Sequence, residues 1–341
     1  MNDLEIRRVD PFDEATLAAW HAVYHSAERH GREQYATPWA LEELRAQVQT
    51  PSRRRTSAYF VGLLAGEAVV SGSVVVPLPD NLTQAELYVT TLPEHRRRGL
   101  GSAMLEVLEQ AMGEHGRTVA SSETAWAYDL GPTGAGSAGL EFATAHGFRL
   151  GLGDVQRRLV LPVADALLDE LAAEAAPHHA GYELRSWVGM VPDELLQGWA
   201  ELSASLMTEA PTGDLLREVE VVDLDAVREG EVLGRRQGRT KYNTVALDPA
   251  GDVVAYTDIA TTVHEPGRAY QWGTLVRRDQ RGHRLGLAVK VANLRLLQRE
   301  APDADHVLTW NAEVNGHMIG VNERLGFAAT ERLGEFQKHL G

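Results

Sequence analysis

The sequence contains no cysteine and is poor in positive charge: 33 Lys and Arg stand against 48 Asp and Glu, which gives a formal net charge of −15. Without cysteine the protein has no disulfides, no thiolate metal ligands and no thiol to carry an acyl group. The negative balance argues against nucleic acid or an anionic membrane as a partner, because both need a basic face. A local group of donors can still hold a small anion.

Long apolar runs are also missing. No stretch reaches the roughly 18 consecutive apolar residues of a membrane-spanning helix, and the first ten residues, MNDLEIRRVD, lack the apolar segment of a secretory signal. We therefore expect a cytoplasmic protein. Its 341 residues, 44% of them hydrophobic, are enough for two domains of roughly 150 residues each.

A pattern of strand, basic turn, glycine-containing loop and helix occurs twice, in residues 85–111 and in residues 270–297. Each half of the chain also closes on a Gly-Phe pair, Gly147-Phe148 and Gly326-Phe327. The offset between the two copies is 185 residues at the first arginine of the loop and 179 residues at the phenylalanine. This agreement indicates that one domain was duplicated.

The alternation of strand-like and helical segments predicts an α/β (α+β) fold for each copy, with a mixed, mostly antiparallel central sheet flanked by helices. The predicted strands are 57–64, 68–76, 85–91, 118–123 and 155–161, then 244–247, 253–263, 269–276, 306–310 and 336–340. The predicted helices are 100–113, 137–146, 163–176, 285–299 and 316–325. We predict an N-terminal domain at 1–162, a linker helix and turn at 163–181, and a C-terminal domain at 182–341.

The loop between strand and helix in the first copy is rich in arginine and glycine. Glycines let the main chain approach a ligand closely, and the free N–H groups at a helix start bind anions. The neighbouring arginines Arg96–Arg98 add charge-assisted hydrogen bonds to phosphate. By itself the loop is equally a solvated turn, and its repetition favours a pyrophosphate site. A Walker loop is excluded because no lysine follows the glycines, and Met104 replaces the third glycine of a dinucleotide fingerprint.

The run Arg96-x-x-Gly99-x-Gly101, preceded by Thr91-Leu92-Pro93, resembles the acetyl-CoA motif of the GNAT N-acetyltransferase superfamily. Tandem duplication in a chain of this length resembles the two-domain members, such as mycothiol synthase. The resemblance implies two tandem GNAT-like domains and acetyl-CoA as cosubstrate. It implies transfer of the acetyl group to a primary amine of a small molecule or peptide, by direct attack in a ternary complex, in a monomer or homodimer.

In that superfamily the edge of the fourth strand holds the acetyl and pantetheine groups, and the loop amides hold the pyrophosphate. In the first copy the resemblance assigns these roles to Val89, Thr90, Thr91, Arg96, Arg97, Arg98, Gly99, Leu100, Gly101 and Ser102. In the second copy it assigns them to Thr274, Leu275, Val276, Arg281, Gly282, His283, Arg284, Leu285, Gly286 and Leu287. Arg284 stands where the motif has its first glycine, and it either blocks the pyrophosphate or binds it.

A second motif of the superfamily is an Asn that opens the fourth helix, followed by a Tyr seven residues later. The second copy has Asn315 at the first position and Asn322 in place of the tyrosine, so the resemblance adds both to the cofactor-binding residues. Asn315 is equally an ordinary helix N-cap. The first copy has Gly136 and Ala143 instead. Each copy departs from a different motif, and which copy is active stays open.

Acetylation of an amine needs a base for the amine and an acid for the departing thiolate. Glu86 and Tyr88 lie two residues apart on one strand and therefore share a face. Glu86 is the candidate base and Tyr88 the candidate acid, although two side chains of a solvated or packed face fit the pattern equally. The second copy has Gln271 and Gly273 at these positions, and neither titrates.

Asp258 and His317 are the alternative catalytic groups in the second copy. The histidines show no spacing typical of a metal site, and we expect no metal. The competing function is a non-catalytic protein that binds or senses acyl-CoA, with one or both domains degenerate.

Overall fold

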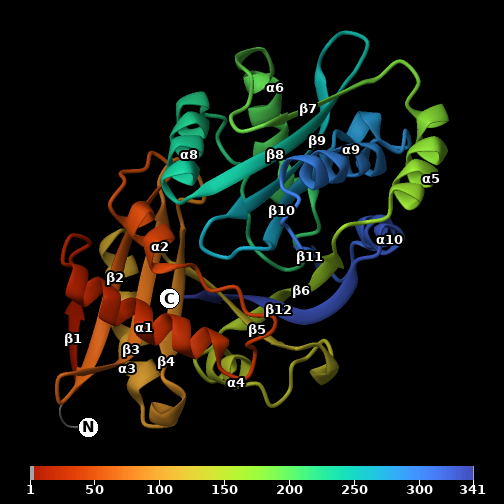
Figure 1. The fold of residues 1–341 in the computed structure, drawn as a ribbon. Helices are drawn as coiled ribbons and strands as arrows, with labels where there is room; N and C mark the ends of the chain where they lie inside the picture. Colours follow the sequence, from red (N-terminus) through yellow and green to blue (C-terminus); the bar gives the residue numbers. More distant parts are fainter. Residues whose placement is uncertain (1–3, 341) are drawn as a thin grey trace. The chain divides into compact units, whose positions relative to one another are not determined.

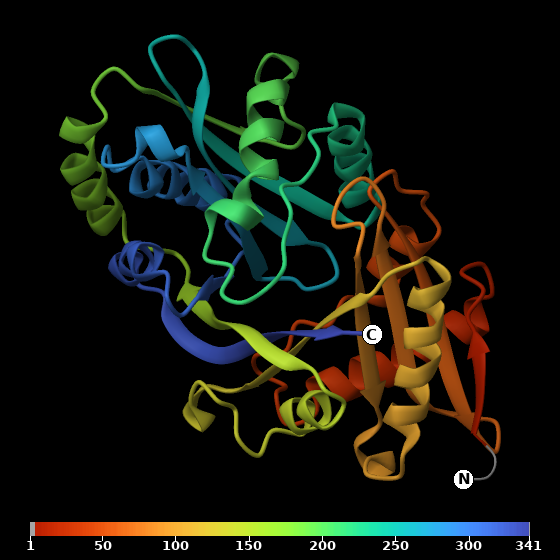
Figure 2. The ribbon, with the colours of Figure 1, turned by 180° about the vertical axis from the view of Figure 1, so that it is seen from behind.

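The computed structural model describes residues 4–340, which form two compact units (Figures 1 and 2). Unit 1 contains the chain up to Gly153, residues 213–216 and the C-terminal segment from Glu331. Unit 2 contains residues 154–212 and 217–330. The α/β fold with mostly antiparallel sheets is confirmed in both units. The predicted boundaries at 162 and 181 concern the two copies of the repeat and stay a prediction.

The sheet of unit 1 has the strand order β1-β2-β3-β4-β5-β12. The strands are β1 Leu4–Arg8, β2 Arg55–Leu64, β3 Glu67–Pro77, β4 Gln84–Thr91, β5 Val119–Ala127 and β12 Ala328–His339. Neighbours are antiparallel except β4 and β5, which run parallel. These two pair only from Gln84 to Glu86 on β4, so beyond Glu86 the β4 edge that faces β5 lacks a strand partner within the described chain.

Helices cover both faces of this sheet. Helix α1 (Glu14–Arg29) lies across one face in Figure 1, and α3 (Leu100–Glu114) lies across the other in Figure 2. The predicted α3 is confirmed, because its apolar residues recur every fourth position and are buried against the sheet. The shorter helices of the unit are α2 (Leu41–Val48) and α4 (Ala138–Ala145).

The sheet of unit 2 repeats this plan in the order β7-β8-β9-β10-β11-β6. The strands are β6 Arg149–Val160, β7 Glu183–Val188, β8 Arg239–Leu247, β9 Val253–Thr262, β10 Arg268–Val276 and β11 His306–Ala312. Only β10 and β11 are parallel, and they pair from Arg268 to Tyr270 on β10 and then part. The helices are α5 Asp165–Ala175, α6 Asp193–Ala204, α7 Leu206–Glu209, α8 Leu224–Arg236, α9 Leu285–Glu300 and α10 Gly316–Leu325.

The last strand of each half of the sequence belongs to the sheet of the other unit. Residues 154–160 of β6 pair with β11 in unit 2. Residues 331–339 of β12 pair with β5 in unit 1. The sequence predicts both strands, although β12 begins at Ala328 rather than at residue 336. It does not predict the exchange, because a strand pattern does not specify the pairing partner.

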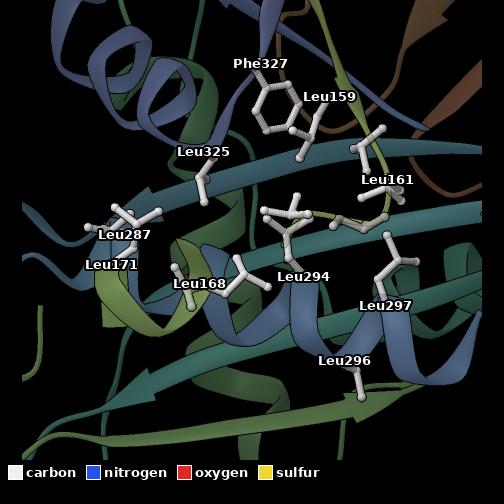
Figure 3. Packing of buried hydrophobic residues seen from close by; sticks show 14 of the residues in the cluster. Leu159, Leu161, Leu168, Leu171, Leu287, Leu294, Leu296, Leu297, Leu325 and Phe327 are labelled. Atoms are coloured by element: carbon white, nitrogen blue, oxygen red, sulfur yellow. The ribbon is translucent and has the colours of Figure 1, made fainter. Parts of the chain in front are cut away.

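Helix α5, predicted as part of the linker, lies against α9 inside unit 2. Leu168 and Leu171 of α5 are buried in one apolar cluster with Leu287, Leu294 and Leu297 of α9 (Figure 3). The sequence does not predict helices α1, α2, α6, α7 and α8 or strands β1 and β7.

Candidate functional site

The loop between β4 and α3 passes twice through left-handed backbone conformation, at Arg97 (φ +61°) and at Gly99 (φ +82°). Gly99 is the N-cap of α3 and has no side chain to satisfy the helix end. The N–H of Ala103 is the first to bond back into the helix, to Gly99 O at 3.1 Å. The amides before it point out of the helix end, which is the arrangement that binds phosphate.

The arginines of this first loop have few acidic partners. Arg96 Nε donates to Thr91 O (3.3 Å), and Arg98 Nη1 lies 2.9 Å from His95 Nδ1. Arg97 has Glu141 at 4.0 Å, and both side chains are exposed, so this pair contributes little. Within residues 4–340, neither Arg96 nor Arg98 forms an ion pair with a carboxylate. Their charge is available to an anionic ligand.

The second loop has the same backbone shape. Left-handed residues occur at the matching positions, Gly282 (φ +90°) and Arg284 (φ +51°), and Arg284 is the N-cap of α9. Arg281 Nε donates to Val276 O (3.4 Å), as Arg96 does to Thr91 O. Arg284 therefore keeps the conformation of the glycine that it replaces, and its side chain forms an ion pair with Glu174 of α5.

Carboxylates accompany the other arginines of the second loop as well. Glu209 Oε2 accepts from Arg281 Nη2 (2.9 Å) and from Arg278 Nε (3.2 Å). Glu174 also pairs with Arg324 of α10. The two loops thus have the same backbone conformation and differ in charge, because Glu174 and Glu209 neutralise the guanidiniums of the second loop.

The first turns of α3 and α9 also differ in polarity. Ser102 of α3 is half-buried, and its Oγ lies 3.0 Å from His146 Nε2 at the end of α4. The matching residues of unit 2 are Leu287 and Leu325, both buried in the apolar cluster that α5 completes. A polar, half-buried residue in the first turn of α3 corresponds to a buried, apolar residue in the first turn of α9.

The candidate catalytic residues of unit 1 are in contact with each other. Tyr88 Oη donates to Glu86 Oε2 at 3.2 Å, on the face of the sheet that α1 covers. Burial and the negative charges of Glu123, Glu86 and Glu335 raise the pKa of Tyr88 well above its usual value of 10.0. Glu123 on β5 and Glu335 on β12 are register partners. Tyr88 is therefore a protonated phenol beside three carboxylates at neutral pH.

The matching region of unit 2 contains a buried lysine. Lys290 of α9 is 1% exposed, and its Nζ donates to Gln271 Oε1 and Asn322 Oδ1, both at 2.9 Å. The Asn322 amide donates to Asn311 Oδ1 (2.5 Å), and the Gln271 amide donates to Thr257 Oγ1 (2.6 Å). Both amides thus turn their oxygens to the lysine. Asn322, predicted to bind cofactor, is fully buried in this network.

Burial lowers the pKa of Lys290 from 10.5 to about 7. Between pH 7 and pH 10.5, Lys290 carries a proton in the unfolded chain but not in the folded chain. The contribution of Lys290 to the free energy of unfolding of unit 2 therefore rises with pH. Leu105 is the residue of the first copy that matches Lys290. We expect Lys290→Leu to lower the slope of the unfolding free energy against pH by about 1.4 kcal/mol per pH unit between pH 7 and 9.5. Urea unfolding followed by tryptophan fluorescence checks this. Four tryptophans lie in unit 2 (Trp187, Trp199, Trp272 and Trp310) and three in unit 1 (Trp20, Trp39 and Trp126), so both units contribute to the signal.

The Lys290→Leu variant also leaves two buried amide oxygens without a donor, so its absolute stability changes at every pH. The diagnostic quantity is the difference in pH slope between variant and wild type. Equal slopes would show that Lys290 is charged in the folded protein.

The other predicted residues of unit 2 have structural partners. Asp258 is 3% exposed and accepts from Gly273 N (2.9 Å) and Lys241 Nζ (2.8 Å), which fixes the irregularity in β10. Asn315 is the N-cap of α10 and accepts from Met318 N (3.2 Å). His317 is exposed on the first turn of that helix. Carboxylates around the loops and Lys290 are the features that sequence reasoning missed, because their partners lie far away in the chain.

Comparison with known proteins bears on both units. A family model described as "Acetyltransferase (GNAT) family" matches residues 20–126, all in unit 1. A solved "tandem GNAT protein from the clavulanic acid biosynthesis pathway" is 28% identical, with 99% of each chain covered and a TM-score of 0.80. In both comparisons the chain is similar to GNAT proteins. It has the tandem architecture of that neighbour over its whole length, which confirms the resemblance seen in the sequence.

More distant GNAT structures share the fold. A GCN5-related N-acetyltransferase from Sphaerobacter thermophilus is 16% identical over 99% of this chain and 96% of that one, with a TM-score of 0.65. No curated protein matches the chain significantly. The GNAT fold supports acyl-CoA-dependent acetyl transfer in general, and members of the family act on small molecules or peptides.

Two further observations concern the described residues, 4–340. No helix among them combines the length and the apolar character needed to cross a membrane. No group of three or more His, Asp or Glu side chains in this part of the chain is arranged to hold a metal ion.

Proposed function

We propose that unit 1 of this tandem GNAT protein transfers an acetyl group from acetyl-CoA to a primary amine of a small molecule or peptide. The observation that carries the proposal is the loop of residues 96–102, where outward-pointing amides lie at a helix start beside Arg96 and Arg98, which form no ion pair with a carboxylate in the described part of the chain. The acetyl and pantetheine groups lie along Val89–Thr91, where β4 has parted from β5. The match of the family model to residues 20–126 supports this choice of unit.

The residues around Tyr88 suit the chemistry of direct attack. The amine must lose a proton to attack the thioester carbon, and Glu86 is the base that accepts it. As the C–S bond breaks, Tyr88 donates its phenolic proton to the departing thiolate. The carboxylates of Glu86, Glu123 and Glu335 favour a cationic amine over an anionic acceptor at this face.

The residues of the second copy are left out of the proposed site. Gln271 and Gly273 do not titrate, Asp258 is held by two donors, and the loop guanidiniums are paired. Arg284 neither blocks nor binds a phosphate in this arrangement, because its side chain is turned to Glu174.

Arg96 and Arg281 provide a matched test of the cofactor site. Each donates from Nε to the last residue of the preceding strand, so Arg96→Gln and Arg281→Gln lose the same structural hydrogen bond. We expect Arg96→Gln to weaken acetyl-CoA binding about tenfold or more, through loss of a charge-assisted bond to phosphate. We expect Arg281→Gln to leave the affinity unchanged. Titration calorimetry gives both values, and equal effects of the two variants would contradict the choice of unit 1.

A further inference from the structure

The anion-binding loop of unit 2 has a carboxylate at each side. Glu174 lies between Arg284 at the start of α9 and Arg324 at the end of α10. Glu209 lies between Arg278 and Arg281. A negative charge near a helix N-terminus is favourable, and Glu174, paired with the N-cap Arg284 of α9, supplies one without any ligand.

The contact is part of a wider docking of the α5 end on this loop. His283 Nδ1 lies 3.1 Å from His178 O, and its ring is 5.3 Å from the ring of Tyr182. Tyr182 Oη donates to Gln280 Oε1 (2.5 Å). Polar contacts therefore hold residues 174–182 against residues 280–284 along the whole loop.

Apolar packing fixes the helix that carries Glu174. Leu168 and Leu171 are buried with Leu287 in one cluster (Figure 3). The corresponding residue of unit 1, Ser102, is half-buried and polar. Because α5 is anchored in this way, Glu174 is presented to the loop at a fixed position rather than as a mobile surface charge.

We propose that Glu174 and Glu209 are internal occupants of a second phosphate-binding loop, and that they prevent unit 2 from binding CoA. The loop itself retains the two left-handed residues of the first loop and leads directly into the start of α9. Its residues Arg281–Arg284 are exposed to solvent. The guanidiniums of Arg281 and Arg284 are taken up by Glu209 and Glu174, so removing the two carboxylates frees both for a phosphate.

This inference goes beyond the proposed function, which concerns unit 1, and the test separates the two. The double variant Glu174→Gln/Glu209→Gln keeps side-chain size and removes both charges. The control Glu170→Gln/Glu201→Gln changes the net charge equally, at exposed positions of α5 and α6. Calorimetry with free CoA gives the number of sites, and hydrogen–deuterium exchange locates them at residues 96–103 or at residues 281–288.

The expected result is one CoA per chain in the wild type and the control, with protection at residues 96–103. The double variant takes a second CoA, with protection at residues 281–288 and binding there at least about tenfold tighter than in the wild type. If unit 1 binds no CoA, the wild type binds none and the double variant binds one per chain. That result contradicts the proposed function and supports the inference.

Two results would overturn the inference. One is a wild type that already binds CoA at residues 281–288, which needs no variant to detect. The other is a double variant that gains no binding there although its first site and its near-ultraviolet circular dichroism are unchanged.

Discussion

The Tyr88→Phe variant is expected to lower kcat for acetyl transfer by about 100-fold to 10,000-fold, the range of a lost general acid. The KM for acetyl-CoA is expected to stay near the wild-type value, because in the proposed mechanism the phenol acts on the thioester and not on the phosphates. Removal of the hydroxyl leaves the thiolate to depart without a proton. Release of free CoA measures the rate, and a thiol reagent detects it without background because the chain has no cysteine.

The raised pKa of Tyr88 also predicts how the rate of acetyl transfer depends on pH. Burial and the charges of Glu123 and Glu86 keep the phenol protonated above pH 10, so ionisation of Tyr88 does not reduce the wild-type rate below that pH. In the double variant Tyr88→Phe/Glu86→Gln, the increase in activation free energy is expected to be smaller than the sum of the increases in the two single variants, because both groups act in one step.

Tyr256→Phe is the matched control. Tyr256 is buried in unit 2, and burial with the charges of Asp258 and Glu220 raises its pKa well above 10.0. Its loss should not change the rate. If Tyr88→Phe and Glu86→Gln leave turnover unaffected while acetyl-CoA still binds, the competing function of a non-catalytic acyl-CoA-binding protein is favoured.

The second large effect is on stability and concerns the exchanged strand β12. Arg32, after α1, holds Glu331 at the start of the β12 segment that pairs with β5, with Nε–Oε1 at 2.5 Å and Nη2–Oε2 at 2.8 Å. The Glu331 side chain is 2% exposed. Burial alone would lower the pKa of Arg32, but Glu331 and Glu28 outweigh it and raise the pKa above its usual value.

We expect Arg32→Met to lower the free energy of unfolding of unit 1 by about 3–5 kcal/mol, since it leaves a buried carboxylate unpaired. The double variant Arg32→Met/Glu331→Leu should recover most of this loss, because no buried charge remains. Chemical unfolding gives the values, and faster hydrogen exchange over residues 119–127 in the single variant would show that β12 has loosened from β5.

The exposed pair Arg7–Glu5 serves as the control for that measurement. Both side chains are more than half exposed, and we expect Arg7→Met to change the free energy by no more than about 1 kcal/mol. Comparable losses for Arg32→Met and Arg7→Met would mean that the Glu331 carboxylate is solvated in solution.

The sequence by itself determined the fold class, the tandem architecture and the place of both glycine-containing loops between a strand and a helix. These features depend on short-range patterns: apolar residues every fourth position in α3, and glycine or a tolerated arginine at the left-handed positions Gly99 and Arg284. The hydrogen bond between Glu86 and Tyr88 follows from their spacing on one strand in the same way.

Only the tertiary structure decided which loop keeps its charge. Glu174 lies 110 residues before Arg284 in the chain, and Glu209 lies 72 residues before Arg281. Periodicity and spacing describe neighbours within a few residues, so they do not show which carboxylate a distant packing contact brings to a guanidinium. The exchange of β6 and β12, and the amide oxygens that surround Lys290, were set by the same long-range packing.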